Sequence, residues 1–113
     1  MTEARRMSEP SDRSGVQVLT LSGELDMVGI TDVRAELTRV LAAAPPVLVV
    51  DLTGVSFLGS AALSALVDAH RAATRTSLRI VAGDRRTLRP IQLTALDQVL
   101  EVYPTVAEAL AGR

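Results

Sequence analysis

The Ser60 hydroxyl is the best placed group in this sequence for chemistry, because it stands where an apolar strand gives way to a helix. Residues 58–63 read LGSAAL, and apolar residues at helical spacing follow. A helix N-terminus presents unpaired N–H groups and the positive end of the helix dipole. The hydroxyl could therefore cap the helix, which is the simpler interpretation, or carry a phosphate that this end of the helix stabilises.

Nucleophilic catalysis by Ser60 lacks a partner base. The only histidine, His70, lies ten positions further on, so at 100° per residue the two side chains fall on different faces of one helix. We expect His70 to be a partly buried structural imidazole on the apolar stripe. The absence of cysteine and lysine excludes thiolate metal sites, a cysteine nucleophile, a Walker-A loop and Schiff-base chemistry. We expect no catalytic residue, no metal site and no cofactor.

Composition and charge limit the possible partners. The 113 residues suit one domain, and 12 basic against 13 acidic groups leave a net charge of −1. The basic residues are scattered along the sequence, so we expect no nucleic-acid binding. The longest apolar run, 41–50, is interrupted by Pro45 and Pro46 and is too short to cross a bilayer. We expect a cytoplasmic protein without membrane insertion.

Apolar patterns alternate between the periods of strands and helices along the chain. Strands are predicted over 16–21, 47–52, 78–82 and 99–102, and helices over 30–41, 60–73, 86–93 and 105–111. This order predicts a single α/β domain over 15–113, with a mixed, mostly parallel sheet of four to five strands and about four helices. The polar segment 1–14 is predicted to be a flexible tail or a weak edge strand near 4–7.

Three local patterns make the prediction more specific. The continuous apolar run 47–50 indicates a central strand covered on both faces, with a turn at Thr53-Gly54. Pro90 fits the helix 86–93 only if it lies in the first turn. Thr105 and Glu108 have the spacing of a capping box, which would open the last helix.

Several segments, taken in order, resemble the STAS-domain family. They read GELD at 23–26, VDLTGVSFL at 50–58, GSAAL at 59–63 and TALDQVLEVYP at 94–104, within a similarity that covers about 16–110. Within that family the sequence most resembles the bacterial anti-sigma factor antagonists. The resemblance implies binding to a serine-kinase anti-sigma factor, which frees the sigma factor. The kinase ends binding by phosphorylating a hydroxyl at the start of the second helix, and a serine phosphatase restores it.

The resemblance assigns the phosphate to Ser60. The family's acceptor segment usually reads Asp-Ser-Ser/Thr/Ala-Gly-Leu, and Ala61 stands at its second hydroxyl position. The sequence departs from the pattern at Gly59, which replaces the aspartate, and at Ala62, which replaces the glycine. Ala95 replaces the usual glycine before the late leucine, and alanine at either glycine position costs free energy where φ is positive.

The expected partner-binding surface surrounds this serine. Asp26 matches the family's acidic residue near the acceptor, although it could equally cap the first helix or its preceding turn. Helical spacing places Ser64 and Asp68 with Ser60 on the polar side of the second helix. The predicted partner-binding residues are Asp26, Gly59, Ser60, Ala61, Ser64 and Asp68. Arg71, Arg75 and Arg79 are expected to form a solvated edge, with Asp68 able to pair with Arg71.

Two other functions are considered. Gly59 and Ala62 make a phosphorylation-independent role credible, either as a STAS accessory subunit of a lipid-transport ATPase or as a stress-signalling scaffold. A small hydrolase using Ser60 would need a base, a Gly-x-Ser-x-Gly elbow or a metal ligand set, and the sequence offers none of them.

Overall fold

A computed structural model describes the backbone of residues 5–10 and the full residues 15–112. One five-stranded sheet has the order β1-β2-β3-β4-β5, with β1 antiparallel to β2 and the other pairs parallel. The strands are β1 (Arg5–Pro10), β2 (Gln17–Leu25), β3 (Val47–Leu58), β4 (Ser77–Val81) and β5 (Glu101–Tyr103). The helices are α1 (Ile30–Ala42), α2 (Ser60–Ala72), α3 (Arg85–Leu93) and α4 (Val106–Ala111), with a short 3₁₀ turn η1 (Leu96–Gln98). The predicted α/β fold is confirmed.

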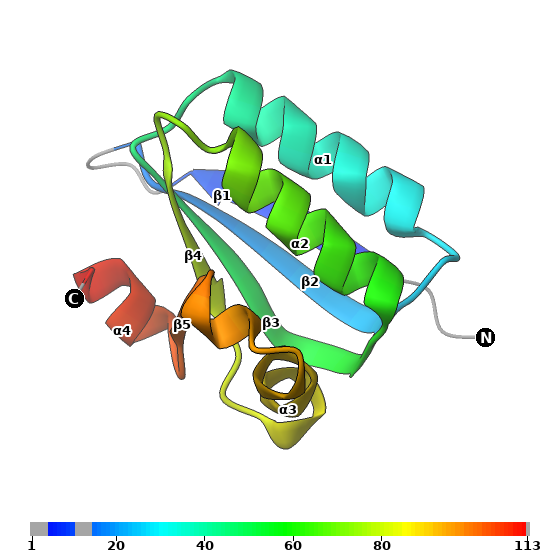
Figure 1. The fold of residues 1–113 in the computed structure, drawn as a ribbon. Coiled ribbons are helices and arrows are strands. Elements are labelled where there is room, and N and C mark those ends of the chain that lie inside the picture. The colour runs from blue at the N-terminus through cyan, green and yellow to red at the C-terminus, as the bar shows by residue number, and fades with distance from the viewer. Residues whose placement is uncertain (1–4, 11–14, 113) are drawn as a thin grey trace.

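The helices cover the two faces of the sheet unequally. Figure 1 shows α1 and α2 side by side on one face and α4 on the other. Leu48 and Val50 of β3 are fully buried in the core beneath α1 and α2, whereas Val49 packs with Ala109 of α4. The continuous apolar run of β3 is therefore covered on both faces, as predicted.

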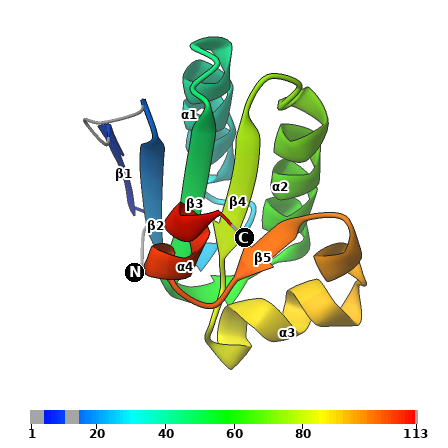
Figure 2. The same ribbon diagram turned by 90° about the vertical axis from the view of Figure 1, so that its left-hand side faces the viewer.

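α3 lies across the end of the sheet at which the parallel strands finish (Figure 2). Asp84 caps this helix, because its carboxylate accepts a hydrogen bond of 2.8 Å from the Arg86 N–H. The expectation that Pro90 must lie in the first turn is wrong, because it is the sixth residue of α3. Pro90 cannot donate to the Arg86 carbonyl, but burial of Ile91 holds the helix against the sheet.

Two strand boundaries differ from those predicted. β3 does not turn at Thr53-Gly54 but continues to Leu58, paired with β2 through two register shifts. The last strand is Glu101–Tyr103 rather than 99–102. In the last helix, the Thr105 Oγ1 accepts a hydrogen bond of 3.1 Å from the Glu108 N–H, as the spacing of the capping box predicts.

The polar segment at the start of the chain contributes the edge strand β1. It pairs residues 5–10 with 17–22 of β2, further along the chain than the weak strand expected near 4–7. The flexible-tail alternative rests in part on 1–4 and 11–14, which lie outside the described residues. The division into a segment 1–14 and a domain 15–113 stays a prediction.

Candidate functional site

Ser60 is the first residue of α2, and it is exposed. The capping position belongs to Gly59, whose backbone is extended at φ −83° and ψ 174°, and no side chain caps the helix. The interpretation of Ser60 as a structural cap is therefore wrong. Its hydroxyl stands at the positive end of a thirteen-residue helix, on the outside of the protein.

Asp26 lies directly against the start of α2. One of its carboxylate oxygens, Oδ1, is 2.9 Å from the position that a Cβ would occupy at Gly59. The Gly59 N–H donates a hydrogen bond of 2.8 Å to the Leu25 carbonyl, which ties the end of β2 to the same point. Asp26 does not cap α1, since that position belongs to Gly29 and no side chain caps the helix. The exposed carboxylate thus lies beside the candidate acceptor.

A groove of about 410 Å³ runs along α2 from Ser60. Ser64 and Asp68 share it with Ser60, so the structure brings together the polar side that helical spacing predicts. The opposite wall comes from the segment after α3. The lining residues are Ser60, Leu63, Ser64, Val67, Asp68, Arg71, Thr94 and Leu96. Gly59 is buried and Ala61 is partly buried, and neither lines this groove.

Four exposed apolar side chains contact the start of α2 or adjoin, in the sequence, residues of this site. Met27 and Val28, next to Asp26, are 78% and 81% exposed. Phe57 is half-exposed, and its ring lies 3.1 Å from the Cβ position at Gly59. Leu93, next to the groove residue Thr94, is 72% exposed. Sequence reasoning missed these four residues, although two apolar residues in the short connection 26–29 were a visible signal.

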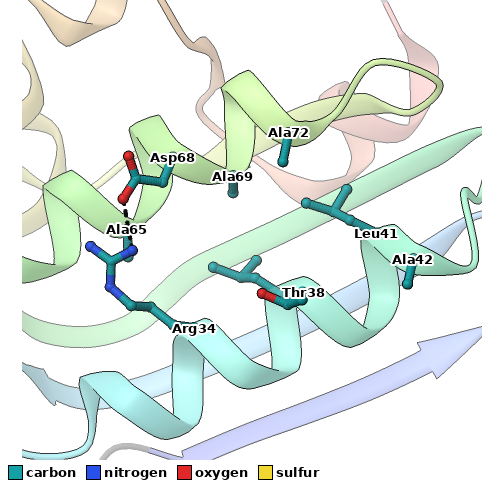
Figure 3. Close-up of a pocket in the computed structure, with 9 residues that line it drawn as sticks. Arg34, Thr38, Leu41, Ala42, Ala65, Asp68, Ala69 and Ala72 are labelled. Atoms are coloured by element: carbon teal, nitrogen blue, oxygen red, sulfur yellow. Dashed lines mark hydrogen bonds and ion pairs between the residues drawn. The ribbon is translucent and has the colours of Figure 1, made fainter.

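Asp68 pairs with a different arginine from the one expected. Its Oδ2 accepts a hydrogen bond of 2.7 Å from Arg34 of α1, and not from Arg71 (Figure 3). This ion pair borders a second groove of about 420 Å³ between α1 and α2, whose lining includes Leu37, Leu41, Ala65, Ala69 and Ala72. Asp68 therefore borders both grooves, and its carboxylate is directed away from its own helix.

The remaining candidates have structural surroundings. Arg79 is not part of a solvated edge, because its guanidinium donates a hydrogen bond of 2.8 Å to the Ala109 carbonyl and one of 3.1 Å to the Ser77 hydroxyl. Arg71 and Arg75 are exposed, as expected. His70 is partly buried and does not line the groove that contains Ser60. Among the residues described, none cluster as metal ligands, and no helix is long and apolar enough to cross a membrane.

Comparison with known proteins identifies the family. The STAS domain model matches residues 9–109. The chain belongs to the STAS-domain family. A curated relative, the anti-sigma-F factor antagonist RsfB of Mycobacterium tuberculosis, is 34% identical over 103 residues, which cover 90% of this chain and 84% of that protein. RsfA, another anti-sigma-F factor antagonist of that organism, is 34% identical over 99 residues, or 84% and 77% of the two chains.

A solved structure agrees with both the sequence relationship and the fold of this STAS protein. The crystal structure of an anti-sigma factor antagonist from Mycobacterium paratuberculosis superposes with a TM-score of 0.90 at 38% identity, covering 96% of this chain and 92% of that one. The chain thus matches proteins of this class over nearly its whole length, and the resemblance inferred from the sequence is confirmed.

Proposed function

We propose that this STAS protein is an anti-sigma factor antagonist, switched off when its serine-kinase anti-sigma factor phosphorylates Ser60. The observation that carries the proposal is the exposure of Ser60 at the N-terminus of α2, within a groove bordered by polar side chains. Exposed Met27 and Phe57 supply apolar area of the kind that a protein partner covers. The relatives named as anti-sigma factor antagonists support the choice of partner.

The physical effect of the phosphate differs between the free protein and the complex. In the free protein it stays in water at the positive end of α2, so the fold is retained. In the complex it would place a charge of about −1.5 to −2 beside Asp26, where the partner has to remove its water. A penalty of about 4 kcal/mol would weaken a micromolar complex to the millimolar range.

A phosphorylation assay tests the acceptor. Candidate serine-kinase anti-sigma factors are incubated with the protein and ATP, and the intact mass and the modified peptide are measured. We expect one phosphate on wild type, none on Ser60→Ala, and one on the matched control Ser56→Ala, which changes an exposed hydroxyl outside the groove. A phosphate that persists in Ser60→Ala contradicts the assignment.

A binding assay tests the switch. We expect Ser60→Asp to weaken binding to the anti-sigma factor while circular dichroism and the thermal midpoint stay close to wild type. Loss of the fold in Ser60→Asp would refute a mechanism that acts by blocking contact. Tight binding without any phosphorylation would instead support the phosphorylation-independent role, for which Gly59 in place of the family's aspartate is the relevant difference.

A further inference from the structure

α3 carries three arginines within five residues. Arg85, Arg86 and Arg89 are all exposed on this helix, while Thr87 and Ile91 on its other side are fully buried. The arginines at 85 and 89 are four residues apart, so their side chains share one face of the helix. α3 therefore presents a basic face to solvent and an apolar face to the sheet.

Two of the three arginines are unpaired within the part of the chain that the structure describes. Arg86 is engaged by the capping Asp84, with its Nη2 3.1 Å from Oδ2. Arg85 and Arg89 make no ion pair or side-chain hydrogen bond with any described residue. Their charges are therefore available to an external anion without first breaking a contact inside the protein.

The basic face of α3 ends next to the groove that contains Ser60. Leu93, one helical turn beyond Arg89, is 72% exposed, and Thr94 next to it lines the groove. Exposed Asp26 also lies against the start of α2, at Gly59. A partner that covers Ser60 would thus meet negative charge at Asp26 and positive charge with an apolar side chain on α3.

We propose that Arg85, Arg89 and Leu93 form a docking surface for an acidic, partly apolar protein segment, and that this segment orients the partner over Ser60. The identity of that partner rests on the proposed function. A protein segment suits this surface better than a nucleic acid or an anionic membrane. Its apolar side chain can cover Leu93, and its few acidic groups can reach Arg85 and Arg89 without lying against Asp26, as an extended polyanion would.

A peptide experiment tests the surface without the anti-sigma factor. An acetylated peptide of alternating glutamate and leucine is titrated into ¹⁵N-labelled protein, and amide shifts are mapped. We expect shifts on α3 and at Leu93 that Arg89→Glu abolishes and Arg75→Glu retains. The control reverses a charge that is also exposed, just beyond the far end of α2, and circular dichroism verifies that both variants fold. Shifts confined to other elements, or unchanged in Arg89→Glu, overturn the proposal.

Polyanion probes test the competing occupants. Duplex DNA and phosphatidylglycerol vesicles are titrated into wild type and Arg89→Glu, and we expect neither protein to bind them. Binding of either probe that depends on Arg89 would assign the surface to that polyanion and overturn a protein segment as its occupant.

Association kinetics with an anti-sigma factor that binds wild type test the orienting role. We expect Arg89→Glu to lower the association rate about tenfold at low salt, and less at high salt, with Arg75→Glu unchanged. Equal rates in the two variants would refute the orienting role while leaving the Ser60 switch intact. If no anti-sigma factor binds wild type, the proposed function fails, and the peptide titration still decides the role of α3.

Discussion

The carboxylate of Asp26 fills the space in which a side chain at Gly59 would lie, with Oδ1 2.9 Å from the Cβ position. The ring of Phe57 borders the same space at 3.1 Å. The connection between β2 and α1 is therefore packed against the first residues of α2 through a glycine. A side chain at position 59 must displace Asp26. The carboxylate beside the start of α2 thus comes from the residue that follows β2.

Gly59→Ala should lower partner binding more than it lowers stability. The Asp26 carboxylate is at the end of a flexible side chain and can rotate away, so we expect the free energy of unfolding to fall by only about 1 kcal/mol. Binding should weaken because the displaced carboxylate belongs to the proposed partner surface. Urea denaturation and calorimetric titration with the anti-sigma factor measure the two effects.

A double-mutant cycle with Asp26→Ala isolates this contact. In the Asp26→Ala background the alanine at position 59 meets no carboxylate, so its additional effect on binding should largely disappear. Strictly additive losses in binding would contradict a role for the contact between the two residues.

Ala95→Gly should stabilise the protein. Ala95 has a φ of 60° and a ψ of 19°, in the left-handed region, where a Cβ costs about 1–2 kcal/mol. Glycine removes this strain but adds freedom to the unfolded chain, so we expect a net gain of about 0.5–1 kcal/mol. Urea denaturation measures it, and a loss of stability would show that the strain is relieved in some other way.

Ala62→Gly is the matched control, because the family pattern has a glycine at this position too. Ala62 lies inside α2 and is 2% exposed. Glycine there loses the helix propensity of alanine and a buried methyl group, so we expect a loss of about 1 kcal/mol or more. Changes in the free energy of unfolding of opposite sign at positions 95 and 62 would show that the gain at Ala95 comes from relief of backbone strain and not from glycine as such.

The helices and strands could be predicted from the sequence because they depend on local periodicity. The ends of a strand could not be predicted where pairing with a neighbouring strand decides them. The turn expected at Thr53-Gly54 is replaced by a continuing strand. There Ser22 pairs with Gly54, and a Cβ on that glycine would lie 3.1 Å from the Ser22 Cβ. Glycine permits this close approach of β2 to β3, which no pattern within either segment reveals.

The site divides in the same way between local and distant contacts. Helical spacing was sufficient to place Ser60, Ser64 and Asp68 on one side of α2. The wall formed by Thr94 and the pairing of Asp68 with Arg34 depend on elements far away in the sequence, so no spacing rule could reveal them. Spacing within α2 favours Arg71, at i+3, as the partner of Asp68. The packing of α1 against α2 brings Arg34 to that carboxylate instead.

The Arg34–Asp68 pair should contribute little to stability. The two side chains are 41% and 56% exposed, so water and salt screen their attraction. A double-mutant cycle with Arg34→Gln and Asp68→Asn should give a coupling free energy below about 1 kcal/mol, which falls further in 1 M salt. A large coupling that is insensitive to salt would indicate that the pair holds the groove between α1 and α2 in shape.

Asp84 should make stability depend on pH in the acid range. Hydrogen bonds from the Arg86 side chain and backbone lower the pKa of Asp84 below its usual value of 3.8. The folded state therefore holds this proton less tightly than the unfolded state. The stabilisation is present above the unfolded pKa and is lost as pH falls through the folded one.

Asp84→Asn tests this dependence, because asparagine also caps helices but carries no charge. We expect wild type to have the higher thermal midpoint at pH 7, and the difference between the two proteins to shrink as pH falls below about 4. Thermal denaturation across this range measures the difference. If it widened in acid, the carboxylate would instead be held in its protonated form by the fold, and the ion pair with Arg86 would not be the cause.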